Sequence, residues 1–196
     1  MEKLFLEKPS IERKKDVLEF LKEFVENNSE LYGSKGLIKC TTYEEWLDDV
    51  NKSTDKTYTE SKYEVPSSTY FVVREEDNEI VGIVNIRHYL DRILNQIGGH
   101  IGGSIRPSER GKGYSEVLLY LALLECNKLG LKDIMIDCTK ENIRSEKTIK
   151  ALGGSFDREF YYQPIKRFIK NYTINVDESI KKYEKEYNIK TLGLKK

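Results

Sequence analysis

The segment Arg110-Gly111-Lys112-Gly113-Tyr114-Ser115 combines basic side chains with two glycines. It joins a strand-like run that ends at Ile105 to a helical run that begins at Tyr114. The first turn of a helix has unpaired N–H groups and carries about +0.5 charge from the helix dipole. Glycines let the backbone approach an anion closely and adopt positive φ. These residue types at this spacing therefore predict a cradle for a phosphate group.

The two common nucleotide motifs fit this segment poorly. A Walker A loop has Ser or Thr after its lysine, whereas Gly113 follows Lys112. A dinucleotide fingerprint has a third glycine where Glu116 stands, and its acidic residue follows the next strand, whereas Asp133 precedes that strand's apolar core. Taken alone, the loop also fits a basic turn with ordinary helix-capping glycines.

The first half of the chain must supply elements that position this loop. Leu4–Leu6 is predicted to be a short strand, and Ser10 to cap a helix whose apolar residues recur at helical spacing: Val17, Leu18, Leu21, Phe24 and Val25. The capping box Thr42-x-x-Glu45 opens a second helix through Val50. Residues 51–68 are polar and predict an irregular connection.

In the second half of the chain, the pattern of apolar residues changes from helical spacing to runs typical of strands. Residues 69–74 and 80–86 flank a polar turn and predict an antiparallel hairpin. The remaining expected elements are a glycine-rich strand over 98–105, a largely buried helix over 114–129, a strand over 134–138, a short helix over 145–152, strand-like runs over 156–162 and 165–174, and a charged helical segment over 177–196. This order predicts a mixed α/β sheet covered by helices. We expect one domain over residues 1–175 and a charged, helical C-terminal tail over 176–196.

Arg110-x-x-Gly113-x-Ser115 resembles the pyrophosphate loop of the GNAT superfamily of acetyltransferases, which reads Gln/Arg-x-x-Gly-x-Gly/Ala. Ser115 departs from that pattern but is still small. Asn142-x-x-Ser145, followed by Leu152-Gly153-Gly154, resembles the second motif of the family. The resemblance covers roughly residues 4–174, and the fuller string from His100 to Tyr114 is similar to a bacterial subgroup of predicted acetyltransferases.

The resemblance implies a twisted, mostly antiparallel sheet of about seven strands, with a central parallel pair that splays apart and about four flanking helices. Acetyl-CoA, as the acyl donor, would lie in the gap between the splayed strands. The backbone of Ile105 and Arg106 would bond the pantetheine arm, and the N–H groups of Arg110, Gly111, Lys112, Gly113, Tyr114 and Ser115 would hold the pyrophosphate. Asn142 and Ser145 would complete the cofactor-binding set.

The chemistry implied by the resemblance is direct attack of a neutral amine on the thioester, with a base to remove the ammonium proton. His100, in the glycine-rich run, is the candidate base, because the ordinary pKa of histidine suits that role; a hydrogen-bonded structural histidine is the alternative. If His100 is structural, Glu64, Asp91 or a water chain would have to serve. Many family members have a tyrosine as acid toward the thiolate where this chain has Ile149; Tyr161 and Tyr162 are other candidates.

Composition excludes several classes of protein. Lys plus Arg and Asp plus Glu are 33 each, so there is no overall field to attract nucleic acid or an anionic membrane. The longest apolar run, 117–124, is far shorter than the ~20 residues of a membrane span, and the N-terminus lacks the apolar core of a signal peptide. Three cysteines without a CxxC pair suggest neither a disulfide framework nor a metal site. We therefore expect a cytoplasmic protein without a metal.

The function predicted from the sequence is acetyl-CoA-dependent transfer of an acetyl group to a primary amine of a small molecule. Two alternatives remain open: a CoA-binding sensor or regulatory module without turnover, which Ile149 at the expected tyrosine position keeps open, and a transferase that acts on proteins or peptides. The charged C-terminal segment is expected either to mediate a homodimer or to pack on its own domain.

Overall fold

The computed structural model describes residues 2–195, which form eight strands and six α-helices. The strands are β1 (Leu4–Glu7), β2 (Ser67–Arg74), β3 (Ile80–Arg87), β4 (Ile101–Ile105), β5 (Asp133–Thr139), β6 (Ser155–Tyr162), β7 (Arg167–Asn175) and β8 (Thr191–Lys195). The helices are α1 (Lys14–Glu26), α2 (Tyr43–Lys52), α3 (Lys56–Ser61), α4 (Tyr114–Lys128), α5 (Ile143–Ala151) and α6 (Val176–Tyr187). The predicted mixed α/β fold is confirmed.

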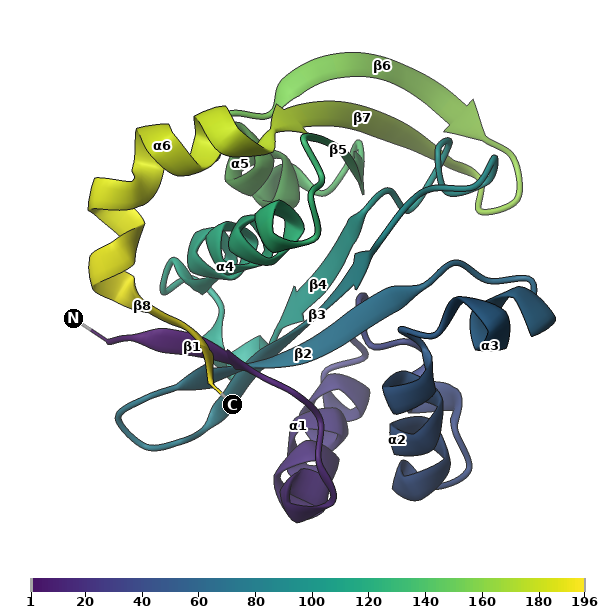
Figure 1. The fold of residues 1–196 in the computed structure, drawn as a ribbon, viewed down its shortest axis with the longest axis vertical. Helices are drawn as coiled ribbons and strands as arrows, with labels where there is room; N and C mark the ends of the chain where they lie inside the picture. The colour runs from purple at the N-terminus through teal and green to yellow at the C-terminus, as the bar shows by residue number, and fades with distance from the viewer. Residues whose placement is uncertain (1, 196) are drawn as a thin grey trace.

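The strands form two sheets that meet at their edges (Figure 1). A five-stranded sheet has the order β4-β3-β2-β1-β8, and a three-stranded sheet has the order β5-β7-β6. All neighbouring strands are antiparallel except β1 and β8, which are parallel. Strands β4 and β5 are therefore the edges that face each other.

Strands β4 and β5 touch only near their beginnings. The N–H group of His100 donates to the carbonyl of Met135 at 2.8 Å, and the N–H group of Met135 donates to His100 Nδ1 at 3.0 Å. Beyond this point the strands separate, and residues from both line one cleft into which the starts of α4 and α5 also open. The two strands thus run in the same direction and splay apart, as the resemblance implied.

Helices cover both faces of the large sheet (Figure 1). Helix α4 packs on one face, and ten of its fifteen residues are buried, because its apolar residues surround the whole helix. Helices α1 and α2 cover the other face through Phe20, Phe24 and Trp46. The apolar face predicted for α1 was too wide, since Leu18 and Val25 are exposed at its edges.

Two segments differ from the expectation. Residues 51–68 contain the short helix α3, which begins because Asp55 accepts a hydrogen bond from the N–H group of Tyr58 at 2.9 Å. The C-terminal segment forms the expected helix, α6, and also a strand, β8, that pairs with β1. The segment expected to be a tail thus contributes to the main sheet and, through Val176 and Tyr187, to the main core.

Candidate active site

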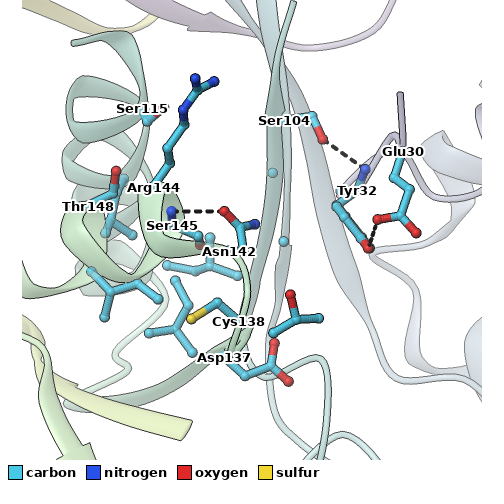
Figure 2. Close-up of a pocket in the computed structure, with 18 of the residues that line it drawn as sticks. Glu30, Tyr32, Ser104, Ser115, Asp137, Cys138, Asn142, Arg144, Ser145 and Thr148 are labelled. Carbon is cyan, nitrogen blue, oxygen red and sulfur yellow. Dashed lines mark hydrogen bonds between the residues drawn. The ribbon is translucent and has the colours of Figure 1, made fainter. Parts of the chain in front are cut away.

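The cleft between β4 and β5 has a volume of about 690 Å³ and is lined by residues of both strands, of α4 and α5, and of the loop at 29–33. Figure 2 shows Arg144, Ser145 and Asn142 on one side of β4, and Glu30 and Tyr32 on the other. The loop that carries Glu30 and Tyr32 lies directly on β4. The N–H group of Tyr32 donates to Ser104 Oγ at 2.8 Å, and a Cβ at Gly33 would overlap the carbonyl group of Gly102.

The start of α4 lines one end of the cleft, where the sequence predicts a phosphate site. Gly113 is the N-cap with φ of +82°, and among residues 2–195 no side chain caps the helix, so the N–H groups of Tyr114 and Ser115 are available to an anion. Arg110 holds the loop in place: Nε donates to the Ile105 carbonyl at 3.1 Å, and Nη2 to Ser29 Oγ at 2.7 Å. The residues present fit a pyrophosphate group.

Six of the ten predicted cofactor residues line the cleft: Ile105, Arg110, Gly111, Ser115, Asn142 and Ser145. The side chain of Lys112 instead pairs with Glu109 at 2.7 Å, and the hydroxyl group of Tyr114 lies 3.2 Å from Arg74 Nη1. Lys112, Gly113 and Tyr114 can therefore act on an anion only through their backbone N–H groups.

Arg106 does not fit its predicted role. Its N–H group donates to the Val81 carbonyl, its carbonyl accepts from the N–H group of Glu109, both at 2.9 Å, and its side chain pairs with Glu23 and Glu79. Hydrogen bonding alternates along an antiparallel pair, and Arg106 is one of the residues whose backbone groups point at β3. The groups that point away from β3, toward the cleft, belong to Ile101, Gly103 and Ile105, and of these the Ile105 carbonyl already accepts from Arg110 Nε.

Asn142 closes β5 and begins α5. Its Oδ1 accepts from the N–H group of Ser145 at 3.1 Å, which fixes the end of the cleft beside the start of α4 (Figure 2). Arg144 and Thr148 also line this end, and sequence reasoning missed both. Two arginines, Arg110 and Arg144, thus face the same cavity, and burial together with the charge of Arg144 lowers the pKa of Arg110.

His100, the candidate base, connects the two splayed strands. Its Nδ1 accepts the Met135 N–H group, so the neutral ring carries its proton on Nε2 and has no free lone pair. Burial lowers its pKa from the ordinary 6.5, which also favours the neutral form. Within residues 2–195, His100 is not among the residues that line the cleft. Its role as base stays a prediction, and this geometry gives it a structural part.

The other catalytic candidates lie apart from the cleft among residues 2–195. Tyr161 packs on Phe168 with ring centroids 5.2 Å apart, Glu64 pairs with Lys35, and Asp91 accepts from the N–H group of Leu94 at 2.8 Å. Ile149 is buried in the cleft wall and supplies no acid.

Two acidic residues that sequence reasoning did not single out line the far end of the cleft, Glu30 and Asp137. Glu30 accepts a hydrogen bond from the Tyr32 hydroxyl at 2.5 Å, and burial together with Glu30 raises the pKa of Tyr32 to about 12. Asp137 Oδ2 accepts from the N–H group of Gly98 at 2.6 Å. This end of the cleft therefore presents carboxylates to an incoming group.

Cys138 also lines the cleft, and burial raises the pKa of its thiol to about 11. A thiol with that pKa is protonated at neutral pH and is a poor nucleophile. A covalent intermediate on Cys138 therefore has no support in this geometry. No cluster of three or more potential metal ligands occurs in the described part of the chain.

Comparison with known proteins decides the family. A model of the acetyltransferase (GNAT) family matches residues 37–153. The chain belongs to the GNAT family. The match includes β4, the phosphate loop, α4, β5 and α5, which are the elements that build the cleft. The family resemblance and the enzyme class predicted from the sequence are therefore confirmed.

Solved structures show the same fold. The microcin C7 self-immunity acetyltransferase MccE, described in complex with acetyl-CoA and AMP, is 14% identical with a TM-score of 0.63, over 88% of this chain and 92% of its own. The spermidine/spermine N-acetyltransferase SpeG of Vibrio cholerae is 15% identical with a TM-score of 0.62, over 92% and 98%. YncA of Salmonella typhimurium, described with acetyl-CoA, is 11% identical with a TM-score of 0.58, over 89% and 95%. No curated protein matches the chain significantly.

Proposed function

We propose that this GNAT protein transfers the acetyl group of acetyl-CoA directly to a primary amine of a small molecule. The observation that carries the proposal is the single cleft, which has an anion cradle at the start of α4 and carboxylates at its other end. The first end suits the pyrophosphate of CoA, and the second suits a cationic amine. The separated strands between them leave room for the thioester.

The proposed binding set for acetyl-CoA follows from the geometry. The pyrophosphate contacts the backbone N–H groups of 111–115, and the pantetheine arm bonds the edge of β4 at the backbone of Gly103 and the N–H group of Ile105. Asn142 and Ser145 border the wall that faces this edge. The acetyl-CoA complexes of MccE and YncA, which share the fold, support this assignment.

A small amine as acceptor is supported by the shape of the acceptor end. Asp137 is half-buried and lines the cleft, so a compact cation reaches it more easily than a folded protein does, whereas Glu30 is exposed and pairs with Arg167 at 3.4 Å. Spermidine is the acceptor named for SpeG, and it is a small amine. A protein or peptide acceptor remains the second candidate for this site.

A screen for release of CoA tests the proposal. The purified protein would be incubated with acetyl-CoA and a panel of alkylamines, polyamines including spermidine, and lysine peptides, with the free thiol measured. Turnover with a small amine supports the proposal, and turnover with peptides alone would favour the protein-modifying alternative. Binding of acetyl-CoA by calorimetry without release of CoA for any amine would favour the sensor without turnover.

Assembly and location stay predictions. Strand β6 is an edge of the small sheet, and its side chains are mostly exposed, so it offers a surface for a homodimer. Sedimentation of the purified chain would test this association. No helix in the part of the chain that the structure describes is long and apolar enough to cross a membrane. A cytoplasmic location is proposed from the sequence alone.

A further inference from the structure

Asp137 occupies the point where β4 and β5 begin to separate. It lies on β5 two residues after Met135, the residue that His100 bonds, and it lines the cleft. The alternate residues Ile136 and Cys138 face α4 and the main core, so Asp137 faces the other side of the sheet. That side carries Glu30 and Tyr32, so Asp137 lies between the thioester gap and the acceptor end.

One carboxylate oxygen of Asp137 remains available to a ligand. Oδ2 accepts from the N–H group of Gly98, whereas Oδ1 has no hydrogen-bond partner within residues 2–195. Oδ1 is also not one of the fully buried unpaired atoms of that range. It is therefore open to the cleft and able to accept a proton.

Asn171 supplies an independent observation. It is the residue opposite Asp137 in the β5–β7 register, at a position where the backbones do not bond each other and the side chains lie closest. The side chain is fully buried, its Nδ2 donates to the Gln96 carbonyl at 3.1 Å, and its Oδ1 is the one buried side-chain atom without a partner among residues 2–195. Because Gln96 offers only a carbonyl, the orientation of the amide is set.

A buried acceptor without a donor is costly, and a neighbouring carboxylate cannot donate to it. A protonated Asp137 can. The pair is therefore arranged so that the neutral carboxylic acid gains a hydrogen bond that the carboxylate lacks, which favours uptake of a proton. Burial also raises the pKa of Asp137 above its ordinary value, against the opposing effects of the Gly98 N–H group and the Arg87 charge.

We propose that Asp137 accepts the proton of the acceptor ammonium and that Asn171 Oδ1 receives the hydrogen bond of the resulting carboxylic acid. The inference rests on the proposed function. In the balanced step, the ammonium gives one proton to Asp137 Oδ1, and the freed lone pair forms the N–C bond to the acetyl carbon. The C–S bond breaks with its electron pair on sulfur, which takes a second proton from nitrogen. Asp137 then returns its proton to solvent.

Within residues 2–195, few other titratable groups face Asp137 and could account for a change of rate with pH in its place. Arg87 of β3 is held by the carbonyls of Gly98 and Gly99, at 2.9 and 2.8 Å, and stays charged throughout. The ring of His100 bonds Met135 where β4 meets β5. Glu30 and Tyr32 line the same cleft, and the pKa of Tyr32 is raised to about 12.

The first experiment compares Asp137→Asn with Asp133→Asn, which changes an exposed aspartate at the start of the same strand. With an alkylamine that is protonated at pH 7, we expect kcat of D137N to fall about 10²–10⁴-fold, the usual range for loss of a general base. With a weakly basic arylamine, which is already neutral, kcat should stay near that of the native enzyme. Acetyl-CoA affinity by calorimetry and all rates of D133N should be unchanged.

Three results would overturn the inference: native kcat in D137N, an equal loss with both amines, or a carboxyl group of Asp137 that titrates in the ordinary aspartate range. The last is measured by carbon NMR of the native protein without substrates, so it decides the matter even where D137N does not fold. A native enzyme without turnover would instead contradict the proposed function.

Asn171→Leu tests the second half of the proposal. It removes the acceptor while keeping the size of the side chain, so the pKa of Asp137 should fall and the acid limb of the pH–rate profile should move to lower pH. A merely structural role for Asn171 would lower the melting temperature and leave that limb in place, and that outcome would contradict its part in the proton transfer.

Discussion

His100 bonds β5 through both its backbone and its ring. Replacement by alanine leaves the N–H group of Met135 unpaired at the strand junction. We expect His100→Ala to lower the free energy of unfolding by about 1–3 kcal/mol, the cost of an unsatisfied half-buried donor. Urea unfolding measures this change.

The pH–rate profile of the same variant separates the two roles of His100. If Asp137 is the base, the acid limb persists in H100A, because the titrating group is still present. If H100A instead loses that limb and its kcat falls about 10²–10⁴-fold, the range for loss of a general base, then His100 is the base, as the sequence predicted.

At the scale of elements, the start of α4 depends on two residues in the left-handed region, Gly111 and Gly113. A branched side chain at Gly113 is strained at φ of +82° and changes the N–H groups that face the anion. We expect Gly113→Val to abolish measurable binding of acetyl-CoA by calorimetry while the fold is retained.

Gly130 offers the matched control for this variant. It has φ of +77° at the other end of α4, and a Cβ there meets open space, as it does at Gly113. Gly130→Val should therefore show the same backbone strain with native affinity for acetyl-CoA. Equal affinity in both variants would mean that the anion cradle lies elsewhere.

For the whole molecule, stability should depend on pH through two half-buried histidines. Burial lowers the pKa values of His88 and His100 below the ordinary 6.5. The unfolded chain then binds protons at a higher pH than the folded chain, so stability is lost as the pH falls below about 6.5. We expect the melting temperature to decline from pH 7 to pH 5, with a smaller decline in H100A. A flat profile over this range would contradict the assignment.

The C-terminal segment should also contribute to global stability. Tyr187 is 2% exposed, and its ring stacks on Tyr120 with centroids 5.2 Å apart. We expect Tyr187→Ala to lower the free energy of unfolding by about 3–5 kcal/mol, as for other large aromatic truncations. Ile189→Ala, at an exposed position two residues later, should leave it nearly unchanged. Equal stability of both variants would show that the segment is an independent tail.

The sequence by itself determined most of the elements and the loop that we propose holds an anion. Period, caps and turns depend on neighbours in the chain, so β3, α2 and α4 lie within a few residues of their predicted bounds. This loop is one contiguous run of strand end, loop and helix start. The backbone conformation that its glycines allow is therefore set locally and does not depend on how the rest of the chain folds. The family followed from these same contiguous residues.

Only the tertiary structure decided which groups meet across the cleft. Arg106 lost its predicted role because Val81 and Glu109 occupy its backbone groups, and Glu30 reached the cleft through contact of its loop with Ser104. Asp137 and Asn171 are 34 residues apart, and nothing in either local pattern marks them as partners. Such pairings depend on strand register, which is set by the packing of whole faces rather than by the local sequence.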